Sequence, residues 1–243
     1  RLLENGANTS FVNRIADKSL AIDDLIENPT QTILSSAKRE NIVGQKHLSI
    51  PLPAELYGQL RANSKGLDLA NDSALVQLNQ TAQQFAKHQW SAAPMGEHIQ
   101  TNDAVAPQSI INPARHSDVV GYVQEATTEQ VEQALNNAQA VQDIWARTAK
   151  DTRASYLLRA ADLMEARLEE LMVLLCRESG KTYANAIAEV REAVDFLRYY
   201  ATQMIDLDAN AEVEPLGTML CISPWNFPLA IFTGQVAAAL VAG

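Results

Sequence analysis

Apolar side chains recur with helical spacing over four segments of the chain. One helix is predicted to open at Asn71 or Asp72. A second follows Thr127, whose pairing with Gln130 three positions later forms a capping box. A third is predicted from a capping Asp151 to a stop at Gly180, and a fourth runs through residues 187–201. The apolar positions of the four segments are Leu75, Leu78, Ala82 and Phe85; Val131, Ala134, Leu135, Ala138, Val141 and Trp145; Leu157, Leu158, Ala161, Met164, Leu168, Leu171 and Leu175; and Ile187, Val190, Val194, Leu197 and Ala201.

Two other stretches have the pattern of β-strands. The run "SIINPARHSDVVGYVQEA" predicts two strands around an Asn112-Pro113 turn, with residues 114–118 as a loop. The run "TMLCIS", residues 218–223, is short and continuously apolar, which is typical of a strand buried on both faces. Three helices followed by a buried strand and a new apolar helix indicate an α/β fold.

The first 105 residues show shorter helical patterns and more loop signals than the rest of the chain. Up to about residue 40 the chain shows two short helical patterns, "LLENGANTSFVNRIAD" and "SLAIDDLIENP", the second stopped by Pro29. Residues 41–105 are rich in loop signals and contain the helix that opens near residue 71. The sequence begins with Arg1 and ends in the apolar run "QVAAALVAG", so we expect it to be an internal piece of a longer polypeptide.

Composition narrows the functional classes. Of 243 residues, 47% are hydrophobic and 20% charged, which is typical of a globular chain. The net charge of −10, without a basic run, argues against a nucleic-acid partner for this segment. No stretch reaches the roughly 18 apolar residues that span a bilayer, so a cytoplasmic location is expected. Two cysteines 45 positions apart and four scattered histidines predict neither a disulfide nor a metal site.

The sharpest chemical signal is "CISPWNFPLAIFTG", residues 221–234. It leaves the predicted strand and enters a helix, which is where open α/β sheets place ligands. Pro228 is expected in the first helical turn, with the N–H groups of Leu229 and Ala230 facing back toward the loop. The side-chain amide of Asn226 could then donate a hydrogen bond to an oxygen that becomes anionic during a reaction. On spacing alone, a rigid turn with core aromatics and a capping Asn226 is an equal alternative.

Resemblance favours the first interpretation. The runs "NPARHSDVVGYVQEATTEQVEQAL", "ESGKTYANAIAEVREAVDFLRYYA" and "PLGTMLCISPWNFPLAIFTGQVAAALVAG", in that order, resemble the N-terminal part of the Rossmann-like NAD-binding domain of the aldehyde dehydrogenase superfamily. The opening "RLLENGANTSFVNRIAD" resembles the end of a proline dehydrogenase (β/α)8 barrel. Both occur on one chain in the bacterial bifunctional proline utilization A family. The resemblance divides the chain into a barrel end (1–40), a helical connector (41–107) and the start of the NAD-binding domain (108–243).

The family resemblance implies two oxidations and a set of residue roles. An FAD-dependent site would oxidise proline to pyrroline-5-carboxylate, and an NAD-dependent site would oxidise glutamate semialdehyde to glutamate. Asn226 matches the oxyanion-hole amide, and Phe227 an aromatic that packs on the semialdehyde. The segment matching the dinucleotide lining comprises Ile222, Ser223, Pro224 and Trp225. Three further matches are Arg1 to a proline-carboxylate clamp, Glu4 to a flavin contact, and Glu192 to a glutamate near the substrate amino group. For Glu192, a solvated helix face shared with Glu189 and Arg191 is an equal or better alternative.

The family's catalytic cysteine, general-base glutamate and nicotinamide loop lie downstream of the asparagine turn and have no counterpart here. Cys176 and Cys221 are both interpreted as core thiols. The segment alone is therefore expected to be inactive. The whole enzyme is expected to be a homo-oligomer and is compatible with peripheral membrane association. Two alternatives stay open: an NAD-dependent aldehyde dehydrogenase with an unrelated N-terminal extension, and a non-catalytic helical scaffold.

Overall fold

The computed structural model describes residues 11–46, 49–96, 106–207 and 213–243. The chain forms two compact units, residues 1–52 and residues 53–243. Arg1 and Glu4, assigned by resemblance to the proline site, lie outside the described residues.

The described part of the first unit contains three short helices, α2 (Phe11–Ala16), α3 (Ile22–Ile26) and α4 (Pro29–Arg39). Arg14 joins the first two, because its Nη2 donates to the Asp24 carbonyl at 3.0 Å. Asn28 caps α4 by accepting from Thr30 N–H at 2.9 Å, and Pro29 occupies the first turn. Sequence reasoning used Pro29 only as a stop and missed the helix that begins there.

The second unit begins with a connector that is tied to later helices. A 3-10 turn (Pro53–Glu55) leads to Ser64, whose N–H and hydroxyl both donate to Asp195 at 2.9 and 2.7 Å. The predicted helix follows as α5 (Asp72–Gln84), capped by Asn71, which confirms that prediction. Leu78 of α5 is fully buried in the hydrophobic core.

Three strands form a mixed sheet with the order β1-β3-β2. The antiparallel pair β2 (Gln108–Asn112) and β3 (Arg115–Val123) confirms the two predicted strands, but residues 115–118, expected in a loop, belong to β3. Sequence reasoning missed β1 (Trp90–Ala92), a three-residue strand that pairs parallel with β3. Gly121 allows this pairing, because a Cβ there would lie 2.2 Å from the Trp90 carbonyl oxygen.

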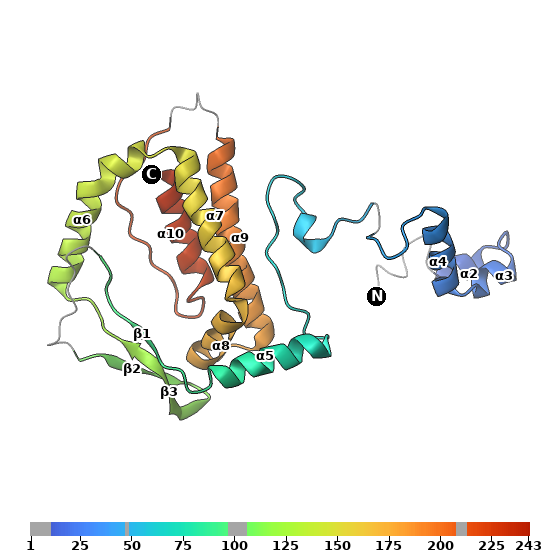
Figure 1. Cartoon of the computed structure of the whole chain (residues 1–243), viewed down its shortest axis with the longest axis horizontal. Coiled ribbons are helices and arrows are strands. Elements are labelled where there is room, and N and C mark those ends of the chain that lie inside the picture. The colour runs from blue at the N-terminus through green and yellow to red at the C-terminus, as the bar shows by residue number, and fades with distance from the viewer. Residues whose placement is uncertain (1–10, 47–48, 97–105, 208–212) are drawn as a thin grey trace. The chain divides into compact units, whose positions relative to one another are not determined.

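Long helices make up the rest of the unit (Figure 1). The helix α6 (Thr128–Arg147) begins with the predicted capping box of Thr127 and Gln130. The expected third helix is divided at Arg167 into α7 (Lys150–Ala166) and α8 (Leu168–Ser179). Asp151 was wrongly predicted as its cap: it lies in the first turn of α7, and the N-cap residue is Ala149. Gly180 ends α8 in the left-handed conformation (φ 66°), as predicted.

Much of the core lies where α7, α9 (Tyr183–Asp206) and α10 (Ala230–Ala242) pack side by side (Figure 1), and α5 and α8 add Leu78, Met172 and Leu175 to it. Val190 and Val194 of α9 are buried, as their spacing predicted. The helix α10 approaches α9 closely at Gly234, where a Cβ would lie 2.9 Å from the Phe196 ring.

Residues 218–223 were wrongly predicted as a buried strand. The described segment 213–224 is extended without strand pairing, and the side chains of Leu220 and Ile222 are 84% and 72% exposed. A strand needs hydrogen-bonding neighbours on its edges, and none of the described strands pairs with this segment.

Candidate active site at the asparagine turn

The segment Pro224–Pro228 forms a tight turn between the extended segment and α10, and we call it the asparagine turn. The N–H of Phe227 donates to the Pro224 carbonyl at 3.2 Å, the bond expected for a β-turn. The helix α10 begins at Ala230 with Leu229 as its N-cap residue. Pro228 therefore lies just before the helix, and its predicted position in the first helical turn was wrong.

The side chains of the turn are accessible. Trp225 is 72% exposed and Phe227 41% exposed, and Asn226 is also exposed. Among the described residues, the Asn226 side chain forms no hydrogen bond, whereas its backbone carbonyl accepts one from Lys181. The alternative with core aromatics and a capping asparagine is therefore wrong: the aromatics are not in the core, and Asn226 does not cap α10.

The cap of α10 comes instead from Glu189 on α9. Its Oε1 accepts from Leu229 N–H at 2.9 Å and from Ala230 N–H at 3.3 Å, and the residue is only 2% exposed. A carboxylate at a helix N-terminus satisfies free N–H groups and opposes the positive end of the helix dipole. These two N–H groups were expected to face the loop, but Glu189 already satisfies them.

Lys181 supplies the opposite charge and reaches the turn itself. Its Nζ lies 2.6 Å from Glu189 Oε2 and donates to the Asn226 carbonyl oxygen at 2.9 Å. The same ammonium is 5.1 Å from the centroid of the Phe227 ring. The Lys181 side chain is 13% exposed, so this is a largely buried ion pair beside an exposed turn.

Sequence reasoning missed both residues, and its alternative interpretation of Glu192 placed Glu189 on a solvated helix face. The helical period contained a signal, because Ala186 and Ala193, at three positions before and four after Glu189, are buried. A carboxylate on the buried face of a helix needs a cation or N–H donors. Lys181, just after a helix stop, was a candidate for that cation.

The residues matched to the lining of a dinucleotide site, 222–225, lead into the asparagine turn and form its first part. Ile222 is 72% exposed, and its carbonyl accepts from Gln235 Nε2 at 2.9 Å, which fixes this part of the segment to α10. Ser223 is half-buried and Pro224 exposed. A cavity of about 680 Å³ adjoins Ile222 and is lined mainly by apolar groups of residues 214–222 and α10.

Glu192 lies on the exposed surface of α9, away from the residues that contact the turn. It lines a separate hollow of about 530 Å³ with the side chains of Arg61, Arg191, Asp195, Phe196 and Tyr199. No residue of the asparagine turn lines that hollow. The structure therefore brings Asn226 and Phe227 together but does not join Glu192 to them.

Neither cysteine has the surroundings of a nucleophile. Cys176 is half-buried on α8, and burial raises the pKa of its thiol, which reduces the thiolate that would react. Cys221 is half-buried in the extended segment and lines an apolar cavity against α6 and α10. Within the described residues, no group of three or more His, Cys, Asp or Glu side chains could hold a metal ion. No helix there is long and apolar enough to cross a bilayer.

Comparisons with known proteins identify the family of this chain. The sequence model of the aldehyde dehydrogenase family matches residues 99–243. Bifunctional protein PutA of Escherichia coli (strain K12) is 54% identical over 243 residues, which is 100% of this chain and 18% of that protein. The 1-pyrroline-5-carboxylate dehydrogenase of Anoxybacillus flavithermus is 37% identical over 186 residues, or 72% of this chain and 36% of that one.

A solved structure gives the same result for the fold. The structure of 1-pyrroline-5-carboxylate dehydrogenase from Thermus with bound NAD is similar over 81% of this chain and 39% of that one, with a TM-score of 0.68 and 28% sequence identity. The chain thus spans less than a fifth of the length of the bifunctional relative and about two-fifths of the solved dehydrogenase. The family match covers more than half of the present chain and includes the asparagine turn. The chain belongs to the aldehyde dehydrogenase family.

Proposed function

We propose that this chain is part of a bifunctional oxidoreductase of proline catabolism. One site of that enzyme oxidises proline to pyrroline-5-carboxylate with FAD, and the other oxidises glutamate semialdehyde to glutamate with NAD. The observation that carries the proposal is the exposed, unpartnered Asn226 amide on a turn whose backbone is fixed by buried contacts. The match to bifunctional PutA over the whole chain supports the pairing of the two activities.

In the aldehyde step, Asn226 is the oxyanion donor. A cysteine thiolate outside residues 1–243 adds to the aldehyde carbon, a C–S bond forms, and the carbonyl oxygen gains the negative charge. The Asn226 Nδ2–H group donates to that oxygen, and because the turn is already fixed, little reorganisation is needed as charge develops. Phe227, half-exposed beside Lys181, packs against the aliphatic part of the semialdehyde.

The cofactor site fits a dinucleotide in part. NAD, when bound, supplies the hydride acceptor for the aldehyde step, and FAD supplies the acceptor for the proline step. Exposed Ile222 and Trp225 and the adjoining apolar cavity offer flat, apolar lining of the kind that suits a base or nicotinamide ring. Ser223 and Pro224 complete that lining. The first N–H groups of α10 do not fit the pyrophosphate, because Glu189 already accepts from them.

The rest of the chain contributes to the proline site and to the link between the two sites. Residues 1–40 form the end of the proline dehydrogenase barrel, with Arg1 on the proline carboxylate and Glu4 on the flavin. Residues 41–107 are the connector. The whole enzyme is a cytoplasmic homo-oligomer, and it is compatible with peripheral membrane association.

The bifunctional proposal is favoured over both alternatives. A monofunctional aldehyde dehydrogenase with an unrelated extension does not account for a match to PutA that covers residues 1–105 as well. A non-catalytic scaffold does not account for a polar amide kept exposed between two aromatic side chains.

The test uses the complete polypeptide in which this chain occurs. Proline-dependent flavin reduction and semialdehyde-dependent NADH formation are measured for the wild type and for Asn226→Ala. We expect the variant to lose about a hundredfold or more in kcat for aldehyde oxidation, because one oxyanion donor is removed. Its proline oxidation should match the wild type. Unchanged aldehyde oxidation in Asn226→Ala would contradict the proposal.

A further inference from the structure

A buried ion pair near the start of α9 contacts the asparagine turn and the beginning of α10. Lys181 follows the left-handed Gly180 that ends α8, and Glu189 lies about two turns into α9. Their exposed fractions are low, 13% for the Lys181 side chain and 2% for that of Glu189. Removing two charges from water costs free energy, so a buried ion pair points to a structural or functional role.

Between them, the two side chains hold both ends of the connection from the turn to α10. Glu189 Oε1 accepts from Leu229 and Ala230, and Lys181 Nζ donates to the Asn226 carbonyl. The Lys181–Glu189 pair, 2.6 Å between Nζ and Oε2, joins these contacts into one connected set. The backbone on each side of Phe227 and Pro228 is therefore fixed to the same connected pair, one residue from the α8–α9 junction and one from α9.

A simple helix cap would not require this arrangement. Helices are commonly capped by a local Ser, Thr, Asn or Asp, which needs no counterion from another element. Here the N-cap residue is Leu229, which forms no side-chain cap, and the acceptor comes from 40 residues earlier in the chain. The arrangement satisfies the carbonyl of residue 226 while leaving the side-chain amide of the same residue unbonded within the described structure.

We infer that Lys181 and Glu189 are positioning residues for the oxyanion donor: they fix the backbone of Asn226 so that its amide is held in place for the reacting oxygen. This inference rests on the proposed function of Asn226. Neither residue touches the reacting atoms. Glu189 also occupies the N–H groups of Leu229 and Ala230, so these two groups are not free to bind the oxyanion.

The test compares Lys181→Met with a matched control in the complete enzyme. Arg198→Met removes another largely buried cation, on α9 itself, whose carboxylate partners are on α7. We expect Lys181→Met to lower kcat for aldehyde oxidation by on the order of tenfold or more, because small misplacements of a catalytic group are costly. KM for NAD and the rate of proline oxidation should stay close to wild type. Arg198→Met should leave all three unchanged.

Glu189→Gln provides a second variant. Its amide oxygen can still accept from Leu229 N–H, but the charge that holds Lys181 is lost, so kcat for aldehyde oxidation should again fall. If Lys181→Met does not fold, Glu189→Gln decides by the same criteria.

Amide hydrogen exchange gives a readout that does not depend on activity. In both variants, exchange of the amides of residues 226, 227, 229 and 230 should be faster than in the wild type by on the order of tenfold, because local opening of the turn becomes easier. Exchange in Arg198→Met should be unchanged there.

The outcomes separate this inference from the proposed function. A kcat unchanged by Lys181→Met and Glu189→Gln, or reduced equally by Arg198→Met, would overturn the inference. If Asn226→Ala itself has no effect on aldehyde oxidation, the proposed function fails first. A loss in Asn226→Ala without a loss in the two pair variants defeats only the positioning role.

Discussion

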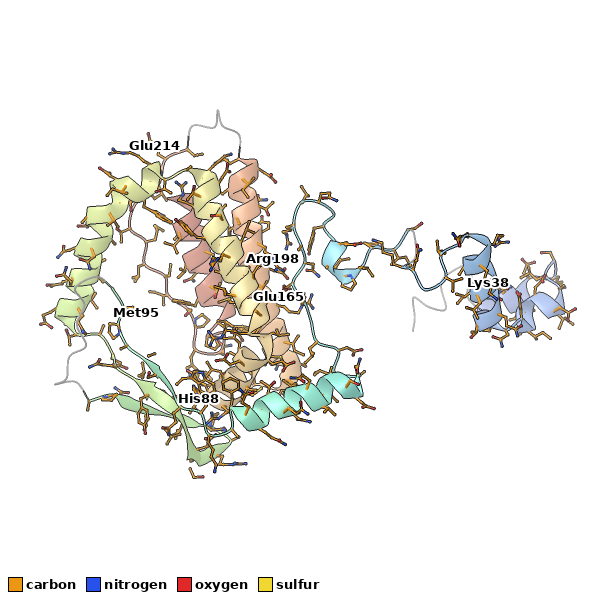
Figure 2. All side chains as sticks on the ribbon, in the orientation of Figure 1. Lys38, His88, Met95, Glu165, Arg198 and Glu214 are labelled. Carbon is orange, nitrogen blue, oxygen red and sulfur yellow. The ribbon has the colours of Figure 1, made fainter. Side chains whose placement is uncertain are left out.

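Two largely buried ion clusters each include one residue of α9, and they connect different parts of the structure. The Arg198 cluster comprises Arg198 with Asp162 and Glu165 of α7; Figure 2 labels Arg198 and Glu165, which lie beside each other where these helices pack. Its ion-pair distances are both 3.0 Å. The Lys181 cluster comprises Lys181 and Glu189, which contact the asparagine turn and the start of α10.

Both clusters are ion pairs, but one joins structural elements and the other supports the proposed active site. In the Arg198 cluster, Glu165 also accepts from Lys65 N–H at 2.6 Å, so the charges join two helices and the connector. Those elements already share a hydrophobic core. In the Lys181 cluster, the charges fix a turn whose aromatic side chains are largely outside the core. A buried ion pair is weak evidence of stabilisation, and what it positions is the better guide to its role.

The largest expected effect on stability is that of Glu189→Ala. The change leaves Lys181 without its carboxylate and removes the acceptor of two helix N–H groups. We expect a loss of about 4 kcal/mol in the free energy of unfolding, since an uncompensated buried charge remains. Urea denaturation followed by circular dichroism measures it. A smaller loss in unfolding free energy than that of Arg198→Met would contradict this prediction, because the Arg198 cluster would then contribute more to stability.

Arg198→Met should cost less, about 2 kcal/mol. Asp162 is 74% exposed and can return to water, and Glu165 keeps its backbone donor. The methionine can also pack against the apolar neighbours of α7 and α9. The same denaturation experiment measures the loss. Faster hydrogen exchange at residues 226, 227, 229 and 230 in this variant would show that the two clusters are not independent.

The Arg198 cluster should also contribute to the loss of protein stability at acidic pH. Burial raises the pKa of Glu165, but hydrogen bonds from Arg198 and Lys65 N–H outweigh it, so the net pKa is lowered. A lowered folded-state pKa stabilises the protein above the unfolded pKa, which is about 4.3 for glutamate, and this stabilisation is lost as pH falls through the folded value. Stability of Arg198→Met should therefore fall less steeply than that of the wild type between about pH 5 and pH 3. Equal slopes in denaturation at each pH would contradict this.

The smallest effect is expected from Thr182→Ala, next to Lys181. Thr182 caps α9 by accepting from Asn185 N–H at 3.3 Å. Loss of this neutral cap should cost about 1 kcal/mol without loosening the turn. Thermal unfolding measures the first and hydrogen exchange the second. A turn loosened as much as in Lys181→Met would mean that the start of α9, and not the charge, positions Asn226.

Local signals predicted the elements that local contacts stabilise. The caps at Asn71, Thr127 and Gly180 were read correctly because each depends on residues within four positions. The break at Arg167 was missed, because the apolar spacing continues through it from Met164 to Leu168.

Features that depend on distant partners were harder to predict. The strand expected at residues 218–223 requires neighbours that no pattern within the segment can supply. The asparagine turn was identified from its own residues, but its support comes from Lys181 and Glu189, roughly 40 positions earlier. Only the helical period around Glu189 pointed to a buried carboxylate.

The central claim is that Lys181 acts on the aldehyde step through Asn226, and a double-mutant cycle tests it most directly. The kcat for aldehyde oxidation is measured for the wild type, Asn226→Ala, Lys181→Met and the double variant. If Lys181 only positions Asn226, the double variant should be no slower than Asn226→Ala alone, because there is no amide left to position. Losses that multiply in the double variant would mean that Lys181 acts independently of Asn226 and would contradict the account.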